Sequence, residues 1–287
     1  MAGAGPLVEE VGAEEVGEAE DLADSAVARR VAAARAEAGK GNMHREKDLA
    51  ELVERLQRAA AQNLRAVVLY GSAAADEFRE EHSDLNVLCV LESTGAAELK
   101  QLQPVSRWWW RKGHPAPLVF RLEELRRSAD VFAIELLDMK QHHRMLLGED
   151  FLAGLEVPMA LHRLQVEREL RVNVIRLRQA YLRSQGRRAE MDEWIIASTS
   201  SFAALFRHSL IALGEEPPAS RRACADRLAA LLGFDVTAIR AVLELREGKS
   251  RDANYDQLFA AYLDVVTKVA EEMDRRFASL TGENRQQ

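Results

Sequence analysis

Cysteine and aromatic side chains are scarce in this chain, which has two cysteines, Cys89 and Cys224, and 6% aromatic residues among 287. The two cysteines lie far apart and have no His or Cys companions at metal-binding spacing. This excludes a dense disulfide framework and a sequence-local zinc motif. We therefore expect both thiols to be reduced and buried, as in a cytoplasmic protein.

Long hydrophobic runs are also lacking. We find no apolar stretch that approaches a membrane span, and the N-terminus shows no basic-then-apolar signal pattern, so a membrane partner is not expected. The apolar fraction of 47% is nevertheless ample for packed cores. A length of 287 residues predicts two domains.

The net charge of −7 argues against nucleic acid as a partner, but it is unevenly distributed. Residues 1–42 carry nine acidic and four basic side chains, so −5 of the charge lies there and −2 in the rest. This segment has no aromatic residue and is predicted to be disordered or loosely helical. It is either a solubilising tail or the product of a start codon upstream of Met43, which precedes a predicted helix.

The most informative stretch spans residues 67–91, where two apolar runs flank a short polar segment. The first run, Leu64–Tyr70, is aliphatic and β-branched and ends in Gly71-Ser72. This pattern predicts a buried strand followed by a tight turn. The second run opens with Ser83-Asp84-Leu85-Asn86 and predicts another strand.

The residue types at these two points suit a site for phosphate and a hard cation. Gly71 lets the backbone turn tightly and approach a ligand, and Ser72 adds a hydroxyl where a short helix is predicted to begin. Asp84 and Asn86 are predicted to share one face of the second strand, where their oxygens could hold Mg²⁺. Singly, each motif is more often structural, but their order between two strands favours a site.

In this order the motifs resemble the nucleotidyltransferase superfamily, which includes DNA polymerase β and the aminoglycoside nucleotidyltransferases. The resemblance covers roughly residues 47–150. It implies a mixed sheet with flanking helices that holds a nucleoside triphosphate and Mg²⁺. By this resemblance Gly71, Ser72 and Asn86 contact the nucleotide, and Asp84 is a catalytic metal ligand.

The chain departs from the family pattern at two positions. The family has Asp-x-Asp where this chain has Asp84-Leu85-Asn86, and many members have glycine where Asp76 stands. Asparagine matches aspartate in shape but carries no charge, so the attraction for a divalent ion beside a triphosphate is weaker. A one-metal or metal-poor nucleotide site is the alternative to the usual two-metal arrangement.

The resemblance also implies a third carboxylate on a later strand. Residues 132–139 resemble that strand, and residues 142–150 resemble the ending that follows it. Glu135 takes the third-carboxylate position and would act as general base or metal ligand. Asp138 would point the other way on an ideal strand. The competing interpretation of Glu135 is a solvent-facing residue on an edge strand.

Helical periodicity surrounds the predicted strands. We expect helices over residues 44–62 and 96–112, a short strand at Leu118–Phe120 and a helical turn at Leu122–Ser128. Trp108, Trp109 and Trp110 end the second helix, and because neighbours lie about 100° apart, one at least should be exposed or at a domain interface. They form either a base-stacking wall or, as we favour, a surface packed on the C-terminal domain.

Beyond residue 155 the pattern is helical throughout, with breaks at residues 185–186, 214–218, 233–234 and 247–254. It predicts three long helices and two shorter ones, Arg221–Leu232 and Val236–Glu247, in an antiparallel bundle. The first of these helices is rich in arginine, which is typical of a solvated face but could also supply positive charge to phosphates.

The sequence therefore predicts an α+β protein: an acidic segment 1–42, a nucleotidyltransferase-type domain 43–155 and an all-α helical bundle 156–287. The function that the resemblance implies is Mg²⁺-dependent transfer of a nucleoside monophosphate from an NTP such as ATP to a hydroxyl of a small-molecule or protein acceptor. The alternative is a catalytically impaired nucleotide-binding or interaction module on the same fold. The acceptor and the oligomeric state, a homo-oligomer included, stay open.

Overall fold

The computed structural model describes residues 43–74, 84–249 and 254–283, which form two compact units. The sheet unit comprises the described residues up to Arg121 together with His142–Asp150. The helical unit comprises Leu122–Gln141 and the described residues from Phe151 onward. The sequence analysis expected Leu122–Gln141 in the first domain, whereas the structure groups this segment with the helices. The predictions for residues 1–42 and Asp76 lie outside the described residues.

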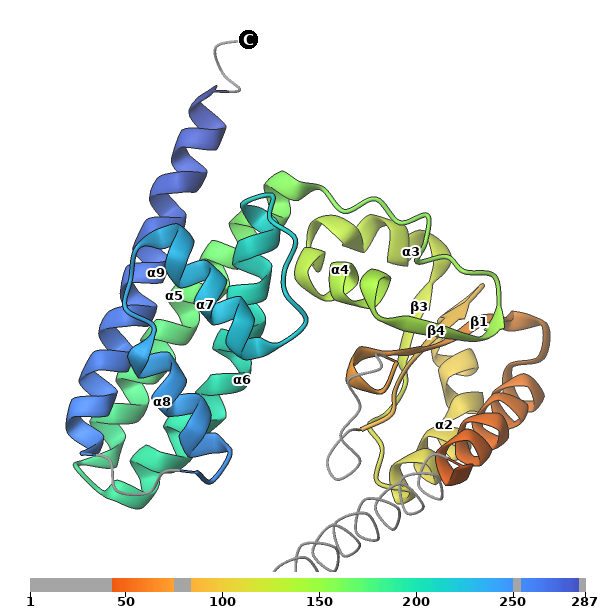
Figure 1. Ribbon diagram of the computed structural model, residues 1–287. Coiled ribbons are helices and arrows are strands. Elements are labelled where there is room, and N and C mark those ends of the chain that lie inside the picture. The colour runs from red at the N-terminus through yellow and green to blue at the C-terminus, as the bar shows by residue number, and fades with distance from the viewer. Residues whose placement is uncertain (1–42, 75–83, 250–253, 284–287) are drawn as a thin grey trace, which may run out of the picture. The chain divides into compact units, whose positions relative to one another are not determined.

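The sheet unit begins with a helix over residues 43–60 and alternates short helices with strands (Figure 1). Its further elements are η1 (Ala61–Asn63), β1 (Leu64–Tyr70), η2 (Gly71–Ala73), β2 (Asn86–Leu91), α2 (Ala96–Arg111), β3 (Leu118–Arg121) and β4 (His143–Gly148). The predicted strands at Leu64–Tyr70 and near residue 118 are confirmed.

The sheet has four strands in the order β3-β2-β1-β4. Strand β1 pairs antiparallel with both β2 and β4, and β2 pairs parallel with β3. The register places Tyr70 at the end of β1 opposite Asn86 at the start of β2. The sheet is therefore mixed, and the turn after its inner strand β1 meets the beginning of the neighbouring strand.

One face of the sheet is covered by the helix over residues 43–60 and by α2. Leucines of the first helix and Leu102, Val105 and Trp109 of α2 form one buried cluster with inward-facing strand residues. On β2 and just before it, Leu85 and Val87 belong to this cluster. Side chains alternate along a strand, so Asn86 between them faces the other side of the sheet, as predicted.

Strand β4 passes so close to β1 that only glycine fits at its end. Gly148 has φ of +82°, and a Cβ built on it would lie 2.0 Å from the carbonyl oxygen of Arg65. Any side chain there would require the two strands to move apart, because the atom that it would meet is backbone.

The helical unit contains α3 (Leu122–Arg127), η3 (Ser128–Asp130), α4 (Ala133–Gln141), α5 (Met159–Ser184), α6 (Arg188–Ala212), α7 (Arg221–Leu232), α8 (Thr237–Arg246) and α9 (Tyr255–Glu283). The predicted three long and two shorter helices after residue 155 are confirmed. Gln185 and Gly233 end α5 and α7 in left-handed conformations, as expected for helix C-termini.

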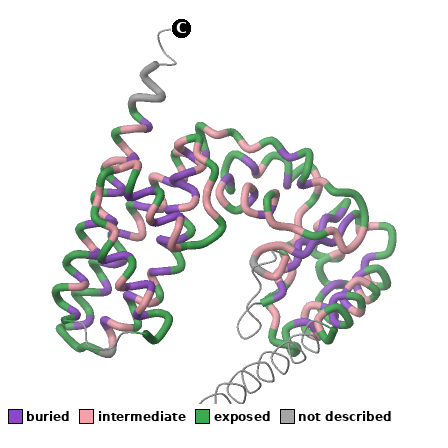
Figure 2. The backbone as a smooth tube through the Cα atoms, in the orientation of Figure 1, coloured by how far each residue is buried: buried purple, intermediate pink, exposed green. Residues whose placement is uncertain are grey.

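Helices α5 to α9 enclose one core of aliphatic and aromatic side chains. Figure 2 marks the buried residues along these helices in purple. Phe202 and Phe206 of α6 and Tyr262 of α9 are among its largest fully buried members. Arg168 and Arg171 on α5 are exposed and pair with Glu169 and Glu167. This supports the interpretation of the arginine-rich helix as a solvated face.

Helix α6 corrects one expectation from the sequence. By length and composition Glu190–Ala212, with a mean hydropathy of 1.2, is long and apolar enough to cross a membrane. The expectation that no apolar run reaches this length was therefore wrong. In the structure 56% of this window is buried, and its apolar side chains lie in the core of the helical unit.

Candidate functional site

The turn after β1 has the backbone geometry that its glycine predicts. Gly71 adopts φ of +80°, directly after extended backbone at Tyr70, and opens the short 3-10 helix η2. Ala74 N–H donates to the Gly71 carbonyl oxygen at 2.9 Å and closes the turn. A positive φ costs glycine almost nothing and costs other residues considerably more, which explains the residue type at this position.

One detail of this turn differs from the prediction. The N–H of Gly71 donates to the carbonyl oxygen of His142 at 3.2 Å, just before β4, so it is not available to a phosphate. The amides of Ser72 and Ala73 are the remaining candidate donors of the turn. The side chain of Ser72 is not described, so the role of its hydroxyl stays a prediction.

Asn86 lies directly beside this turn. A Cβ built on Gly71 would be 3.5 Å from Asn86 Nδ2, an ordinary van der Waals contact. The close approach follows from the antiparallel pairing of Tyr70 with Asn86. The sheet thus brings together two predicted site residues that are 15 positions apart in the sequence.

Asp84 is exposed and lies two residues before Asn86, in the loop that leads into β2. Between them Leu85 is buried in the sheet unit's core. The Leu85 side chain therefore anchors this loop, while Asp84 remains accessible to a ligand. Asp84, Asn86 and the Gly71 turn form the candidate site of the sheet unit.

His114 is a neighbour of this site that the sequence analysis missed. The Leu85 N–H donates to His114 Nδ1 at 3.4 Å, and the imidazole packs on the Trp109 ring with centroids 4.3 Å apart. Burial lowers the pKa of His114 despite the opposing charges of Asp48 and Asp84. His114 is thus favoured in its neutral form, with Nδ1 as acceptor. It lies in the loop between α2 and β3, where no local sequence pattern distinguishes it.

The three tryptophans have different environments. Trp109 is fully buried in the sheet unit's own core, and Trp110 is 70% exposed. Trp108 is partly buried against the same core, with the Arg55 guanidinium 4.5 Å and the Lys112 ammonium 5.4 Å from its ring centroid. The favoured interpretation, packing on the C-terminal domain, is thus wrong for Trp108 and Trp109, which pack within their own unit.

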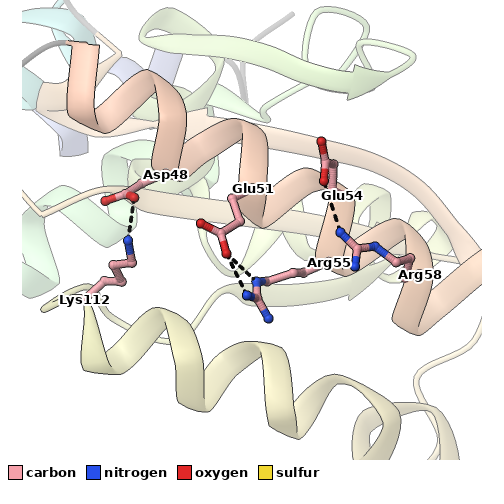
Figure 3. Close-up of polar contacts among 6 residues, drawn as sticks. All are labelled: Asp48, Glu51, Glu54, Arg55, Arg58 and Lys112. Carbon is pink, nitrogen blue, oxygen red and sulfur yellow. Dashed lines mark hydrogen bonds and ion pairs between the residues drawn. The ribbon is translucent and has the colours of Figure 1, made fainter.

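One ion pair links the helix of residues 43–60 to the end of α2, and two further pairs lie within that helix (Figure 3). Lys112 Nζ at the end of α2 donates to the buried Asp48 carboxylate at 2.7 Å, and Glu51 pairs with Arg55 at 2.6 Å. Lys112 is therefore committed to an internal ion pair.

The predicted strand over residues 132–139 is wrong, because Ala133–Gln141 forms helix α4. The buried residues of this segment, Ala133, Leu136 and Met139, recur every three positions, which is helical spacing. Ile134 is the only β-branched residue between Ala133 and Gln141, and the leucines and Met139 favour a helix. The misleading signal was the apolar character of the run.

Glu135 accordingly lies on α4 in the helical unit and not on a strand beside Asp84. Its carboxylate is exposed and accepts a hydrogen bond from Gln165 Nε2 at 2.9 Å. Its role as general base or metal ligand is not tested by this geometry. Asp138, the neighbour that the sequence analysis also considered, pairs with Arg207 and His208 within the helical unit.

The described residues include no cluster of three His, Cys, Asp or Glu side chains that could hold a metal. The sheet unit offers the Asp84 carboxylate and the Asn86 amide oxygen. Mg²⁺ is commonly held by one or two carboxylates together with substrate phosphates and water. The residues therefore fit a metal that arrives with a nucleotide, and they do not form a complete cation site by themselves.

Comparison with known proteins gives structural likeness only. No protein-family model and no curated protein matches the sequence. The chain is similar to the spectinomycin adenyltransferase of Enterococcus faecialis, solved with ATP and spectinomycin, at 10% identity over 79% of this chain and 99% of that one, with a TM-score of 0.49. It is also similar to a nucleotidyltransferase-like protein of Exiguobacterium sibiricum at 10% identity, over 77% and 74%, with a TM-score of 0.34. At these values the likenesses say nothing further about this chain's activity.

Proposed function

We propose that this chain is a nucleotidyltransferase-like protein that binds a nucleoside triphosphate at the turn after β1. The observation that supports this most directly is the placement of Gly71, at φ of +80°, beside Asn86 at the start of the antiparallel strand β2. The exposed Asp84 precedes the same strand. A tight glycine turn and two oxygen-bearing side chains are the parts that a phosphate and cation site needs.

In this proposal the backbone amides of Ser72 and Ala73 bind phosphate oxygens, and Asn86 orients the nucleotide through its amide. Asp84, with phosphate oxygens of the nucleotide, would hold Mg²⁺, which would supply positive charge to the triphosphate. Leu85 and His114 keep Asp84 in place, since one is buried and the other accepts the backbone N–H between Asp84 and Asn86.

The proposed reaction is transfer of a nucleoside monophosphate to an acceptor hydroxyl. The hydroxyl oxygen forms a bond to the α-phosphorus, the bond from that phosphorus to the bridging oxygen breaks, and pyrophosphate leaves. The hydroxyl proton passes to a general base, for which the family resemblance assigns Glu135. Its carboxylate is exposed and accepts a hydrogen bond from Gln165 Nε2.

The second candidate function is nucleotide binding without transfer, and Asn86 is the observation that favours it. An amide in place of a carboxylate leaves Asp84 as the single charged group of the candidate site in the sheet unit. Less negative charge holds a divalent ion more weakly beside a triphosphate. Such a protein would keep the phosphate turn and use the bound nucleotide as a signal or as a structural ligand.

Calorimetric titration of the full chain with ATP, GTP, CTP and UTP, with and without Mg²⁺, tests the proposal. We expect one nucleotide to bind, and Gly71→Val to abolish binding because a β-branched residue resists the turn's positive φ. Gly233→Val is the matched control, since Gly233 has φ of +71°, ends α7 in the helical unit and has open space around it. Equal binding by wild type and Gly71→Val would place any nucleotide elsewhere.

Pyrophosphate release separates the two candidate functions once binding is established. A coupled assay with the nucleotide that binds, Mg²⁺ and a panel of hydroxyl-bearing small molecules should show release that Asp84→Asn removes. Binding that depends on Gly71, with no release for any acceptor, would favour the module without transfer.

A further inference from the structure

A chain of buried polar side chains crosses three helices of the helical unit. His162 of α5 and His208 of α6 are both 0% exposed, and His162 Nε2 lies 3.0 Å from His208 Nδ1. His208 Nε2 lies 3.1 Å from Oδ2 of Asp138 on α4, an ion-pair distance, although its N–H is not aligned for a hydrogen bond. These two imidazoles and one carboxylate thus link α4 to α5 and α6.

The charged groups around these three polar side chains come from each of the three helices. Arg207 of α6 pairs with the Asp138 carboxylate and also donates to Gln141 at the end of α4. Arg163 of α5 adds a second positive charge near His162 and donates to the carbonyl oxygen of Ala212 at 3.0 Å. The Asp138 carboxylate is thus already paired with Arg207, and an additional positive charge on His162 would lie near the Arg163 guanidinium.

The positions of the protons follow from these contacts. With a single His208 proton on Nε2, next to the Asp138 carboxylate, His208 Nδ1 accepts from the Nε2–H of His162. This leaves His162 Nδ1 as a bare nitrogen, buried and without a hydrogen-bond partner in the described part of the chain. A proton can add there only by creating a cation in the interior. Accordingly, burial first and the neighbouring His208 second lower the pKa of His162 to about 4.

We propose that His162, His208 and Asp138 form an acid-sensitive latch that holds α4 on α5 and α6, and that opening of the latch loosens the turn at Gly71. The link between the latch and the Gly71 turn rests on the connectivity of the polypeptide. Helix α4 ends at Gln141, which Arg207 holds, and the next residue, His142, accepts the Gly71 N–H at 3.2 Å. Only the description of that turn as a phosphate site rests on the proposed function.

The direction of the effect is set by where protons bind. In the open state His162 meets water and takes up a proton below a pKa of about 6.5, whereas in the closed state it resists protonation down to a pKa of about 4. Acid therefore favours the open state between these two values. For His162 alone, the opening equilibrium should increase about thirtyfold from pH 7.5 to pH 5.0.

Hydrogen–deuterium exchange of the full chain at pH 7.5 and 5.0, corrected for the intrinsic effect of pH, measures this opening. We expect peptides of α4 to lose protection by about the thirtyfold factor given above, and peptides covering residues 64–74 to lose protection with them. Peptides of α7 in the same unit report on global unfolding and should stay protected. Constant protection of α4, or equal losses in α4 and α7, would overturn the latch; loss in α4 alone would overturn its link to Gly71.

Two variants identify the groups responsible. His162→Gln keeps a polar side chain without a titratable group, and α4 should then exchange equally at both pH values. Asp138→Asn removes the carboxylate anchor, and α4 should already be open at pH 7.5. His44→Gln, at an exposed histidine of the sheet unit, is the control and should behave as wild type. No nucleotide is present, so failure of the latch and failure of the proposed function are separate results.

Discussion

The candidate site of the sheet unit and the polar chain of the helical unit use similar side chains in opposite ways. Asp84 is exposed and adjoins a tight glycine turn, whereas Asp138 is held by Arg207 and His208. A side chain that binds a ligand must remain accessible to it, so it contributes little to the stability of the folded state. A group that serves the fold is balanced by its neighbours, and its loss leaves those neighbours unpaired. Stability and binding measurements should therefore separate the two regions.

The largest effect is expected at Gly148, which tests the sheet that carries the site. Gly148→Ala should lower the free energy of unfolding of the sheet unit by about 3 kcal/mol or more, because a Cβ would meet the Arg65 carbonyl and positive φ adds strain. Tryptophan fluorescence during urea unfolding reports mainly on this unit, which holds three of the four tryptophans, Trp108, Trp109 and Trp110. The control is Gly113→Ala in the same unit, which has φ of +91° in open space and should cost only about 1 kcal/mol. Equal losses of unfolding free energy in the two variants would mean that β4 does not approach β1 closely at Gly148.

Low pH should lower the free energy of unfolding of the helical unit more than that of the sheet unit, which carries the candidate site. The pKa of His162 is lowered to about 4 in the folded state, so the unfolded chain binds the proton more readily. Stability is then lost as pH falls from about 6.5 to about 4, by about 3 kcal/mol for this group. The pKa of Asp138 is also lowered, since its contacts with His208 and Arg207 outweigh its burial, and this adds a loss at still lower pH.

Far-UV circular dichroism during urea unfolding at pH 7 and pH 4.5 measures this loss. His162→Gln should reduce the pH dependence, and His44→Gln should not. A dependence that is unchanged in His162→Gln would assign the acid sensitivity to other groups.

Matched substitutions of the two aspartates give a direct test of the comparison. Asp138→Asn should cost about 2 kcal/mol of stability, discounted from the value for a fully buried pair because the carboxylate is 38% exposed. Asp84→Asn should change stability by less than about 0.5 kcal/mol, yet weaken Mg²⁺-dependent nucleotide binding. Urea unfolding measures the stability of both variants, and calorimetry measures their Mg²⁺-dependent nucleotide binding. The distinction between the regions fails if Asp84→Asn is the more destabilising change.

The smallest effect on stability is expected for Asn86→Asp, which creates an Asp-x-Asp pattern at residues 84–86. The new carboxylate would repel Asp84, so the metal-free protein should lose about 0.5 kcal/mol. Mg²⁺ should recover this loss by binding the native state, and nucleotide affinity in Mg²⁺ should rise. Thermal unfolding with and without Mg²⁺ measures both. If Asn86→Asp and Asp84→Asn each leave Mg²⁺ and nucleotide affinity unchanged, this strand face is not a metal site.

Several parts of the fold follow from local sequence. The aliphatic run Leu64–Tyr70 forms β1, and the glycine after it takes the positive φ that its residue type allows. Helix α7 spans the predicted range Arg221–Leu232, between the capping hydroxyl of Ser220 and the left-handed Gly233, because such end signals act over a few residues. The alternation of Leu85, Asn86 and Val87 likewise fixes which side chains face the core.

What the sequence by itself determined is thus the class of most regular elements, the turn at Gly71 and the order of the motifs around it. Tertiary structure decided whether the apolar run 132–139 became strand or helix, because both periodicities fit a short apolar segment and packing selects between them. It also decided the contacts of His114 with Leu85, of Asp138 with His208, and of His208 with His162. These residues are separated by tens of positions, so no local pattern specifies their proximity; only the packing of β2, α4, α5 and α6 brings them together.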